Sequence, residues 1–211
     1  MESRFINDTK NWNNTISGLK TYSLFFYYPK SVDVDSYADH LRELVYDFKG
    51  DRSIQKHQRA AAFFFKPLVK VLNHFFGEDL KDLTLVCIPA STEQAQTVRY
   101  KDFSESLCRE TGMTNTFDMV SIVKDGTPKH IYGHNAVEPV IEIETGKGFF
   151  KGRNVLLFDD IITRGAEMSK YAAFFRDQGA NVVGGISLCR TSREWSPFRG
   201  NPCDDILKKA G

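Results

Sequence analysis

Two adjacent aspartates, Asp159 and Asp160, are the residues of this sequence with the clearest chemical use. Four apolar residues, 155–158, precede them, and two more apolar residues, a short turn and a helical pattern follow. This order predicts a buried parallel strand that leads into a helix. Ligands of open α/β sheets bind at the carboxyl ends of the strands. We therefore expect the two carboxylates to meet hydroxyl groups or a hydrated Mg²⁺ ion at that edge.

The turn after this strand offers a second chemical group. Its residues are Thr163, Arg164, Gly165, Ala166 and Glu167. At the start of a helix, consecutive backbone N–H groups point outward and form a site for an anion such as phosphate. A sugar phosphate would engage the carboxylates and this turn together. The alternative is an ordinary capped junction between a strand and a helix.

The run LLFDDIITRGA, residues 156–166, resembles the signature of type I phosphoribosyltransferases. The resemblance implies that Asp159 and Asp160 hold the ribose hydroxyls of phosphoribosyl pyrophosphate (PRPP) and, indirectly, its Mg²⁺ ion. It also implies that residues 163–167 hold the 5-phosphate. The implied fold is a Rossmann-like α/β domain with a small hood.

A second block of residues is similar to one smaller group within this family. Residues 46–51, which include Lys49, are similar to a block near the start of ComF-like (competence protein F-like) proteins. These proteins are phosphoribosyltransferase relatives linked to DNA uptake. A helix end with charged neighbours explains this block equally well when it is taken alone.

The segment after the apolar strand 83–89 is the expected pyrophosphate site. In the family, the loop after this strand binds pyrophosphate, which assigns Ala90 and Ser91 to it. Arg99 and Lys101 would supply the positive charge that a pyrophosphate leaving group needs. The alternative is that these two cations are solvated surface residues.

A loop rich in turn residues, 124–135, follows a predicted strand at 118–123. The resemblance implies that this loop is a mobile hood, which would bring Lys124, Lys129 or His130 to the pyrophosphate. Closure would keep water away from a reactive intermediate. The alternative is a solvated hairpin.

The remaining pattern alternates strands and helices, which predicts an α/β fold with a mostly parallel sheet flanked by helices. Residues 1–20 are polar and are expected to form a loosely held lead-in, and residues 21–211 a single domain. The aromatic helix predicted over 61–76 is a plausible surface for a homodimer.

Composition excludes several classes of protein. A net charge of +1 argues against extensive nucleic-acid binding. The four cysteines are widely spaced and contain no CxxC pair, which disfavours a zinc ribbon or a disulfide scaffold. No apolar run approaches the length of a membrane span, so we expect a cytoplasmic protein without membrane contact.

These patterns predict a phosphoribosyltransferase that transfers the phosphoribosyl group of PRPP to a nitrogenous acceptor, a base or an amine, and releases pyrophosphate. Glu167 departs from the family, which commonly has Thr or Ser at this place. A carboxylate there would repel an entering phosphate. The alternative is therefore a non-enzymatic protein on the same fold. It would sense PRPP or a nucleotide, or assist DNA-processing proteins during DNA uptake.

Overall fold

A six-stranded sheet forms the centre of the molecule. The computed structural model describes residues 11–50, 52–127, 135, 137–143 and 148–209. All neighbouring strands pair in parallel except the first two of the sheet, which are antiparallel. The strands, in spatial order, are β1 (Asn13–Asn14), β2 (Lys20–Tyr27), β8 (Asn181–Thr191), β7 (Asn154–Ile162), β3 (Leu83–Cys87) and β4 (Thr114–Asn115). The predicted α/β fold with a mostly parallel sheet is confirmed.

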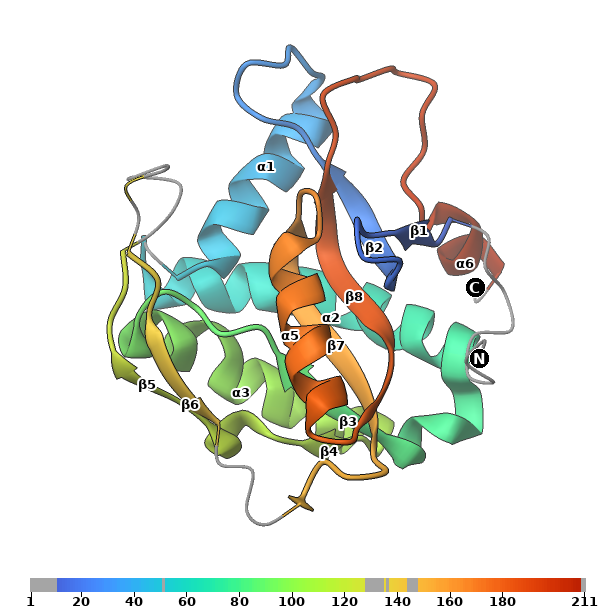
Figure 1. Ribbon diagram of the computed structural model, residues 1–211. Coiled ribbons are helices and arrows are strands. Elements are labelled where there is room, and N and C mark those ends of the chain that lie inside the picture. Colours follow the sequence, from blue (N-terminus) through green and yellow to red (C-terminus); the bar gives the residue numbers. More distant parts are fainter. Residues whose placement is uncertain (1–10, 51, 128–134, 136, 144–147, 210–211) are drawn as a thin grey trace.

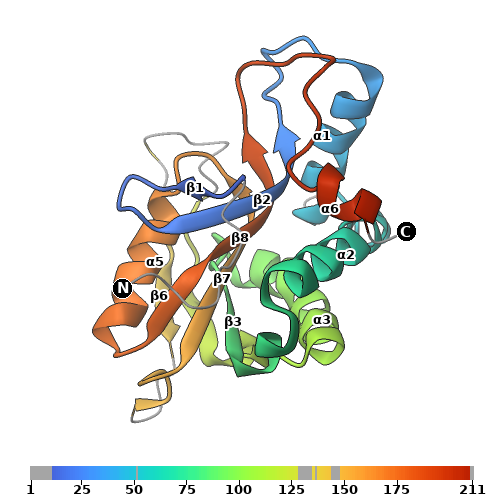
Figure 2. The same cartoon turned by 90° about the vertical axis from the view of Figure 1, so that its right-hand side faces the viewer.

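Helices cover both faces of this sheet (Figures 1 and 2). One face carries α1, α2, α3 and α6, and the other carries α5. The helix bounds are α1 (Ser36–Phe48), α2 (Ile54–Phe76), α3 (Glu93–Thr111), α5 (Ala166–Asp177) and α6 (Asp204–Lys209), with short 3₁₀ turns at Gly77–Asp82 and Phe117–Met119. Local signals set these ends: Asp35 caps α1 by accepting from the Ala38 N–H at 2.8 Å, and Gly112 ends α3 in the left-handed conformation.

Aromatic rings join three helices to the sheet on the larger face. Phe103 of α3 lies 5.0 Å from Phe48 of α1 and 5.6 Å from Phe158 of β7, between ring centroids. Phe64 of α2 packs edge-on against Phe48 at 6.1 Å. All four rings are buried. Burying rings of this size supplies much of the hydrophobic free energy that holds such a layer in place.

On the opposite face, α5 approaches the sheet closely because β8 carries a glycine. A Cβ atom on Gly185 would lie 2.1 Å from the sulfur of Met168 in α5. The helix buries Met168, Tyr171 and Phe175 against β7 and β8. The start of α5 is thereby fixed beside the carboxyl end of β7.

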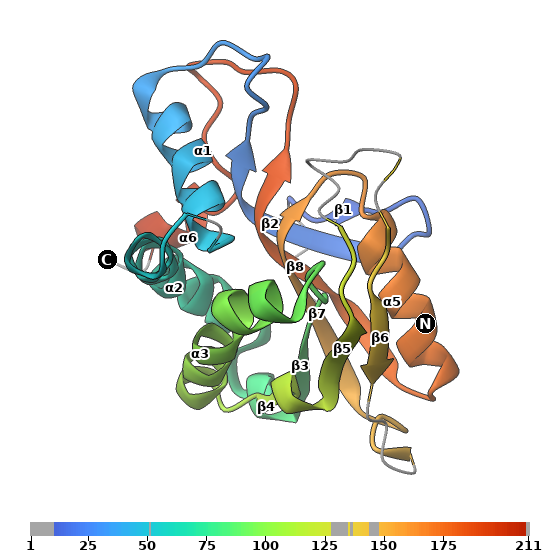
Figure 3. The same cartoon turned by 90° about the vertical axis from the view of Figure 1, so that its left-hand side faces the viewer.

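A separate two-stranded sheet stands beside this layer. Strands β5 (Val120–Lys124) and β6 (Val140–Ile143) pair in an antiparallel manner and lie near α3 and α5 (Figure 3). Ile141 and Ile143 pack against the core beneath α5, and Glu142 is exposed. The two strands of this ribbon flank the loop 124–135 that is expected to be the hood, and residues 128–134 of that loop lie outside the described residues.

The described part of the expected lead-in, 11–20, is packed against the domain. The Trp12 ring lies 5.7 Å from Tyr22 and 5.1 Å from Phe75, between centroids. Thr15 and Leu19 are buried, and β1 pairs with β2. These residues therefore belong to the folded layer and are not loosely held.

All four cysteines, Cys87, Cys108, Cys189 and Cys203, are buried and form no disulfide. Burial raises the pKa of each thiol above its ordinary value. Within the described ranges, we find no helix with the length and apolar character needed to cross a membrane.

Candidate functional site

A cleft of about 450 Å³ opens at the carboxyl ends of β2, β3, β7 and β8. Such a volume suits a small ligand. The cleft brings together predicted residues from two distant parts of the chain: Ala90, Ser91, Arg99, Asp159, Asp160, Thr163 and Glu167. Lys101, Lys124, Arg164, Gly165 and Ala166 are described but are not part of its lining.

Asp160 is the centre of the charged floor of this cleft. It is only 3% exposed, and its carboxylate binds two cations. The Nζ of Lys49 donates to its two oxygens at 3.1 and 2.9 Å, and Nη1 of Arg99 lies 3.1 Å from Oδ2. The side chains of Lys49 and Arg99 are themselves only 17% and 11% exposed. We call these three residues the charged triad.

The aromatic contacts described above hold the charged triad in place. Phe48 directly precedes Lys49, and Phe158 lies two residues before Asp160, on the same side of β7. Phe103 follows Arg99 by four residues, so both lie on the same side of α3. The packing of three rings thus brings together three charges that are far apart in the sequence.

The two carboxyl groups of the pair differ in protonation. Burial alone would raise the pKa of Asp160, but Lys49 and Arg99 outweigh it and hold that pKa below its ordinary value. Burial and the negative charge of Asp160 raise the pKa of Asp159 to about 7. Oδ1 of Asp159 accepts a hydrogen bond from the Asp160 N–H at 2.8 Å and a longer one from the Tyr100 hydroxyl at 3.4 Å. Near neutral pH, Asp160 is the fixed anion and Asp159 can gain or lose a proton.

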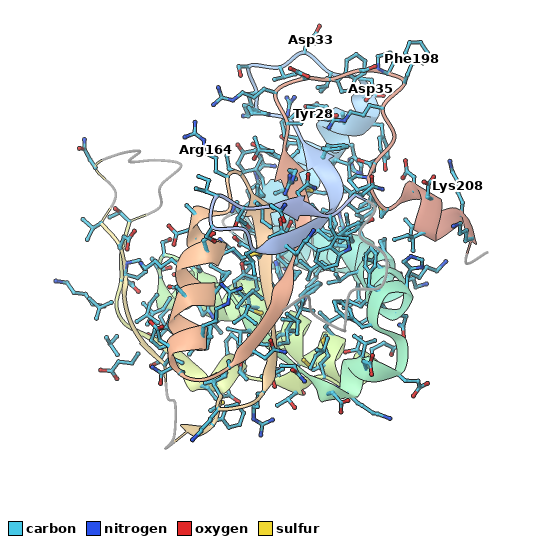
Figure 4. The ribbon with its side chains drawn as sticks, turned by 45° about the vertical axis from the view of Figure 1, so that its right-hand side comes forward. Tyr28, Asp33, Asp35, Arg164, Phe198 and Lys208 are labelled. Atoms are coloured by element: carbon cyan, nitrogen blue, oxygen red, sulfur yellow. The ribbon has the colours of Figure 1, made fainter. Side chains whose placement is uncertain are left out.

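The turn before α5 has the geometry of an anion site. Gly165, the N-cap residue of α5, has φ +75° and provides no side-chain cap, so the amide groups of the first turn are not capped by it. A Cβ on Gly165 would lie 2.4 Å from the Thr15 Cγ2 atom, so this place accepts only glycine without a shift. Thr163 and Glu167 line the cleft, while Arg164 is exposed and extends from the turn (Figure 4).

The expected pyrophosphate loop is shorter than the sequence suggests. Helix α3 begins at Glu93, so Arg99 and Lys101 lie on a helix rather than in a loop. The backbone amides around the helix start have partners within the protein: Ala90 N–H donates to Gln96 Oε1, Glu93 N–H to Asp125 Oδ1, and Ala95 N–H to Thr92 Oγ1. Lys101 is exposed on α3. Side chains, and Arg99 above all, therefore supply the positive charge here.

The ends of the expected hood loop are fastened to the cleft wall. Gly126 N–H donates to the Ser91 carbonyl at 2.7 Å, and Thr127 and Val137 exchange two hydrogen bonds of 2.8 and 2.7 Å. Glu138 pairs with Lys170 of α5 at 2.7 Å. Lys124 is exposed at the end of β5. Lys129 and His130 lie outside the described residues.

Sequence reasoning missed several residues of the cleft. Lys49 lines the cleft, although the sequence indicates it only as part of a block similar to ComF-like proteins, and the hydroxyl of the buried Tyr100 donates to Asp159. The rim of the cleft also carries two hydroxyl pairs, Tyr27 with Tyr46 at 3.0 Å and Thr163 with Thr191 at 3.2 Å. The burial of Tyr100 has a signal in the sequence, because Gln96, Tyr100, Phe103 and Leu107 recur at helical spacing.

The Asp160 carboxylate is paired with cations of the protein itself. Both Asp160 oxygens are occupied by Lys49, one of them also by Arg99. The raised pKa of Asp159 reduces its negative charge at neutral pH. Mg²⁺ prefers carboxylate ligands together with water and phosphate oxygens. Across the part of the chain that the structure describes, no cluster of three or more His, Cys, Asp or Glu side chains is arranged to hold a metal ion.

A scan against models of known protein families finds no match to this chain, and a search of curated proteins finds no significant match.

Proposed function

We propose that this protein is a phosphoribosyltransferase of the type I fold, acting on PRPP and a nitrogenous acceptor. One observation carries the proposal: an acidic pair, two largely buried cations, and Thr163 and Glu167 from the turn that leads into α5 line the same cleft. Ribose hydroxyls, a phosphate and a diphosphate are the groups that such a set would bind. The resemblance of residues 156–166 and 46–51 supports the same assignment.

In the proposed reaction, Asp159 and Asp160 hold the ribose hydroxyls and the first turn of α5 holds the 5-phosphate. The bond between C1 and the diphosphate oxygen breaks, and its electron pair leaves with the diphosphate. The acceptor nitrogen forms the new bond to C1 with its lone pair and loses a proton to water. Arg99 stabilises the charge that develops on the leaving group. The participation of Mg²⁺ remains a prediction of the resemblance.

The test is transfer itself. The natural chain should bind PRPP in a calorimeter and release pyrophosphate when a suitable base or amine is present. The Asp159→Asn variant should lose turnover, because the amide replaces one oxygen that could accept from a ribose hydroxyl with an NH₂ donor. If PRPP does not bind to the natural chain with or without Mg²⁺, the proposed function is wrong.

A binding protein without catalysis is the second candidate, and Glu167 favours it. This carboxylate lies in the first turn of α5 and lines the cleft, where a phosphate would enter. Glu167→Thr removes the charge and restores the residue type of the family. Binding of PRPP only after this change would favour the DNA-processing alternative over both catalysis and PRPP sensing.

A further inference from the structure

The charged triad has more binding capacity than its internal contacts use. Lys49 carries three N–H donors, and its contacts with the two oxygens of the Asp160 carboxylate use two of them. Arg99 carries five, and among the described residues its buried Nε has no hydrogen-bond partner. A buried, unsatisfied donor is costly unless a ligand or water completes it. This donor lies on a side chain that lines the cleft.

We infer that Lys49 and Arg99 together bind the diphosphate group of the ligand without a metal ion, and that Asp160 holds both cations in the empty site. The inference rests on the proposed function and adds Lys49 as a binding residue. Three observations carry it: Lys49 and Arg99 border the cleft, three backbone amides around the start of α3 already have side-chain partners, and the Asp160 carboxylate is paired with both cations.

The charged triad contains two cations and one carboxylate. Lys49 and Arg99, two largely buried cations, lie within 3.1 Å of the single carboxylate of Asp160, and their charges hold its pKa below the ordinary value. Such a cluster attracts an anion more readily than a divalent cation. The diphosphate must, however, compete with Asp160 for the same N–H donors. Removal of the Asp160 charge should therefore strengthen diphosphate binding.

Calorimetry with inorganic pyrophosphate in the presence of EDTA tests this inference. The natural chain should bind, and Lys49→Gln or Arg99→Gln should weaken binding about tenfold, as expected for the loss of a charge-assisted hydrogen bond. Lys101→Gln is the matched control, because Lys101 is an exposed cation on α3 outside the cleft lining. Its affinity should match that of the natural chain.

Asp160→Asn provides the second and more distinctive measurement. It should bind pyrophosphate about tenfold more tightly than the natural chain while it loses phosphoribosyl transfer. A purely structural role for the triad predicts weaker binding in every variant. Tighter binding by Asp160→Asn supports the inference even if Lys49→Gln does not fold.

Three results would overturn the inference: no pyrophosphate binding in EDTA by either the natural chain or Asp160→Asn, equal affinity in Lys49→Gln, or weaker binding in Asp160→Asn. Failure of the proposed function looks different. In that case pyrophosphate still binds through Lys49 and Arg99, but ribose 5-phosphate does not bind and no acceptor supports turnover. Conversely, PRPP transfer with Mg²⁺ but no pyrophosphate binding in EDTA removes only the inference.

Discussion

Asp159 and Asp160 are neighbours in the chain, yet their carboxyl groups have different partners. Asp160 binds two cations, whereas Asp159 accepts from a backbone amide and a tyrosine hydroxyl. The pKa of Asp160 therefore falls and the pKa of Asp159 rises. A pair of acids separated in this way can contribute one permanent charge and one proton that moves near neutral pH.

The raised pKa of Asp159 predicts how stability depends on pH. Its native value is about 7, against an ordinary value of 3.8, so the native state holds more protons than the unfolded state between these values. The contribution of Asp159 to stability is full at low pH and is lost as the pH rises through about 7. The lowered pKa of Asp160 acts in the opposite sense, and its contribution is lost as the pH falls.

Asp159→Asn should remove the pH-dependent contribution of Asp159 to stability and leave that of Asp160. In urea unfolding from about pH 5 to about pH 8, the stability of Asp159→Asn relative to the natural chain should increase with pH. The amide keeps the shape of the side chain but does not ionise. Parallel stability curves for the two proteins would show that Asp159 ionises in the native state at its ordinary pKa.

At the scale of the elements, periodicity predicts much of what the structure contains. The apolar run before Asp159 and the helical spacing after Gly165 predict β7 and α5. Helix α3 begins earlier than the sequence indicates, because its first turns are polar. Its buried side is marked by Gln96 and Tyr100 instead of aliphatic residues. The family resemblance also implies a loop at these residues, where the structure has a helix.

Gly165 links β7 to α5 and allows a prediction about this junction. In Gly165→Ala, the left-handed backbone costs about 1–2 kcal/mol and the overlap with Thr15 about 1–3 kcal/mol more. Urea unfolding should show the combined loss, and calorimetry should show weaker binding of ribose 5-phosphate, because the first turn of α5 is displaced.

Gly152→Ala is the control for this change. Gly152 has the same φ of +75°, but a Cβ there meets no atom within 4 Å. It should lose only the conformational part, about 1–2 kcal/mol, and bind ribose 5-phosphate as the natural chain does. Equal losses of affinity in both variants would show that the turn at Gly165 is not a phosphate site.

The ion pairs of the charged triad could not be predicted from the sequence. Lys49 and Asp160 are 111 residues apart, and their contact depends on how α1, α3 and β7 pack. No periodicity links a residue at the end of one helix to the end of a distant strand. The sequence located both carboxylates and Arg99, but the pairing of Asp160 with two cations became visible only in three dimensions.

At the scale of the whole molecule, the first described residues are part of the domain. The Trp12 ring meets Tyr22 and Phe75, so Trp12→Ala should lower the free energy of unfolding by about 2–4 kcal/mol. Ile16→Ala is the control, because Ile16 is 82% exposed, and it should change stability by less than about 0.5 kcal/mol. Urea unfolding followed by circular dichroism measures both. Equal stability of the two variants would show that residues 11–20 add nothing to the fold.

The burial of all four cysteines makes this chain suitable for site-specific labelling. Reagents that attack thiolates meet four inaccessible thiols with raised pKa values, so the native protein reacts little with them. Val123, on β5, is 52% exposed. A fluorophore on Val123→Cys would therefore be the single label, without removal of any natural cysteine, and its signal would report the position of the β5–β6 ribbon as ligands enter the cleft.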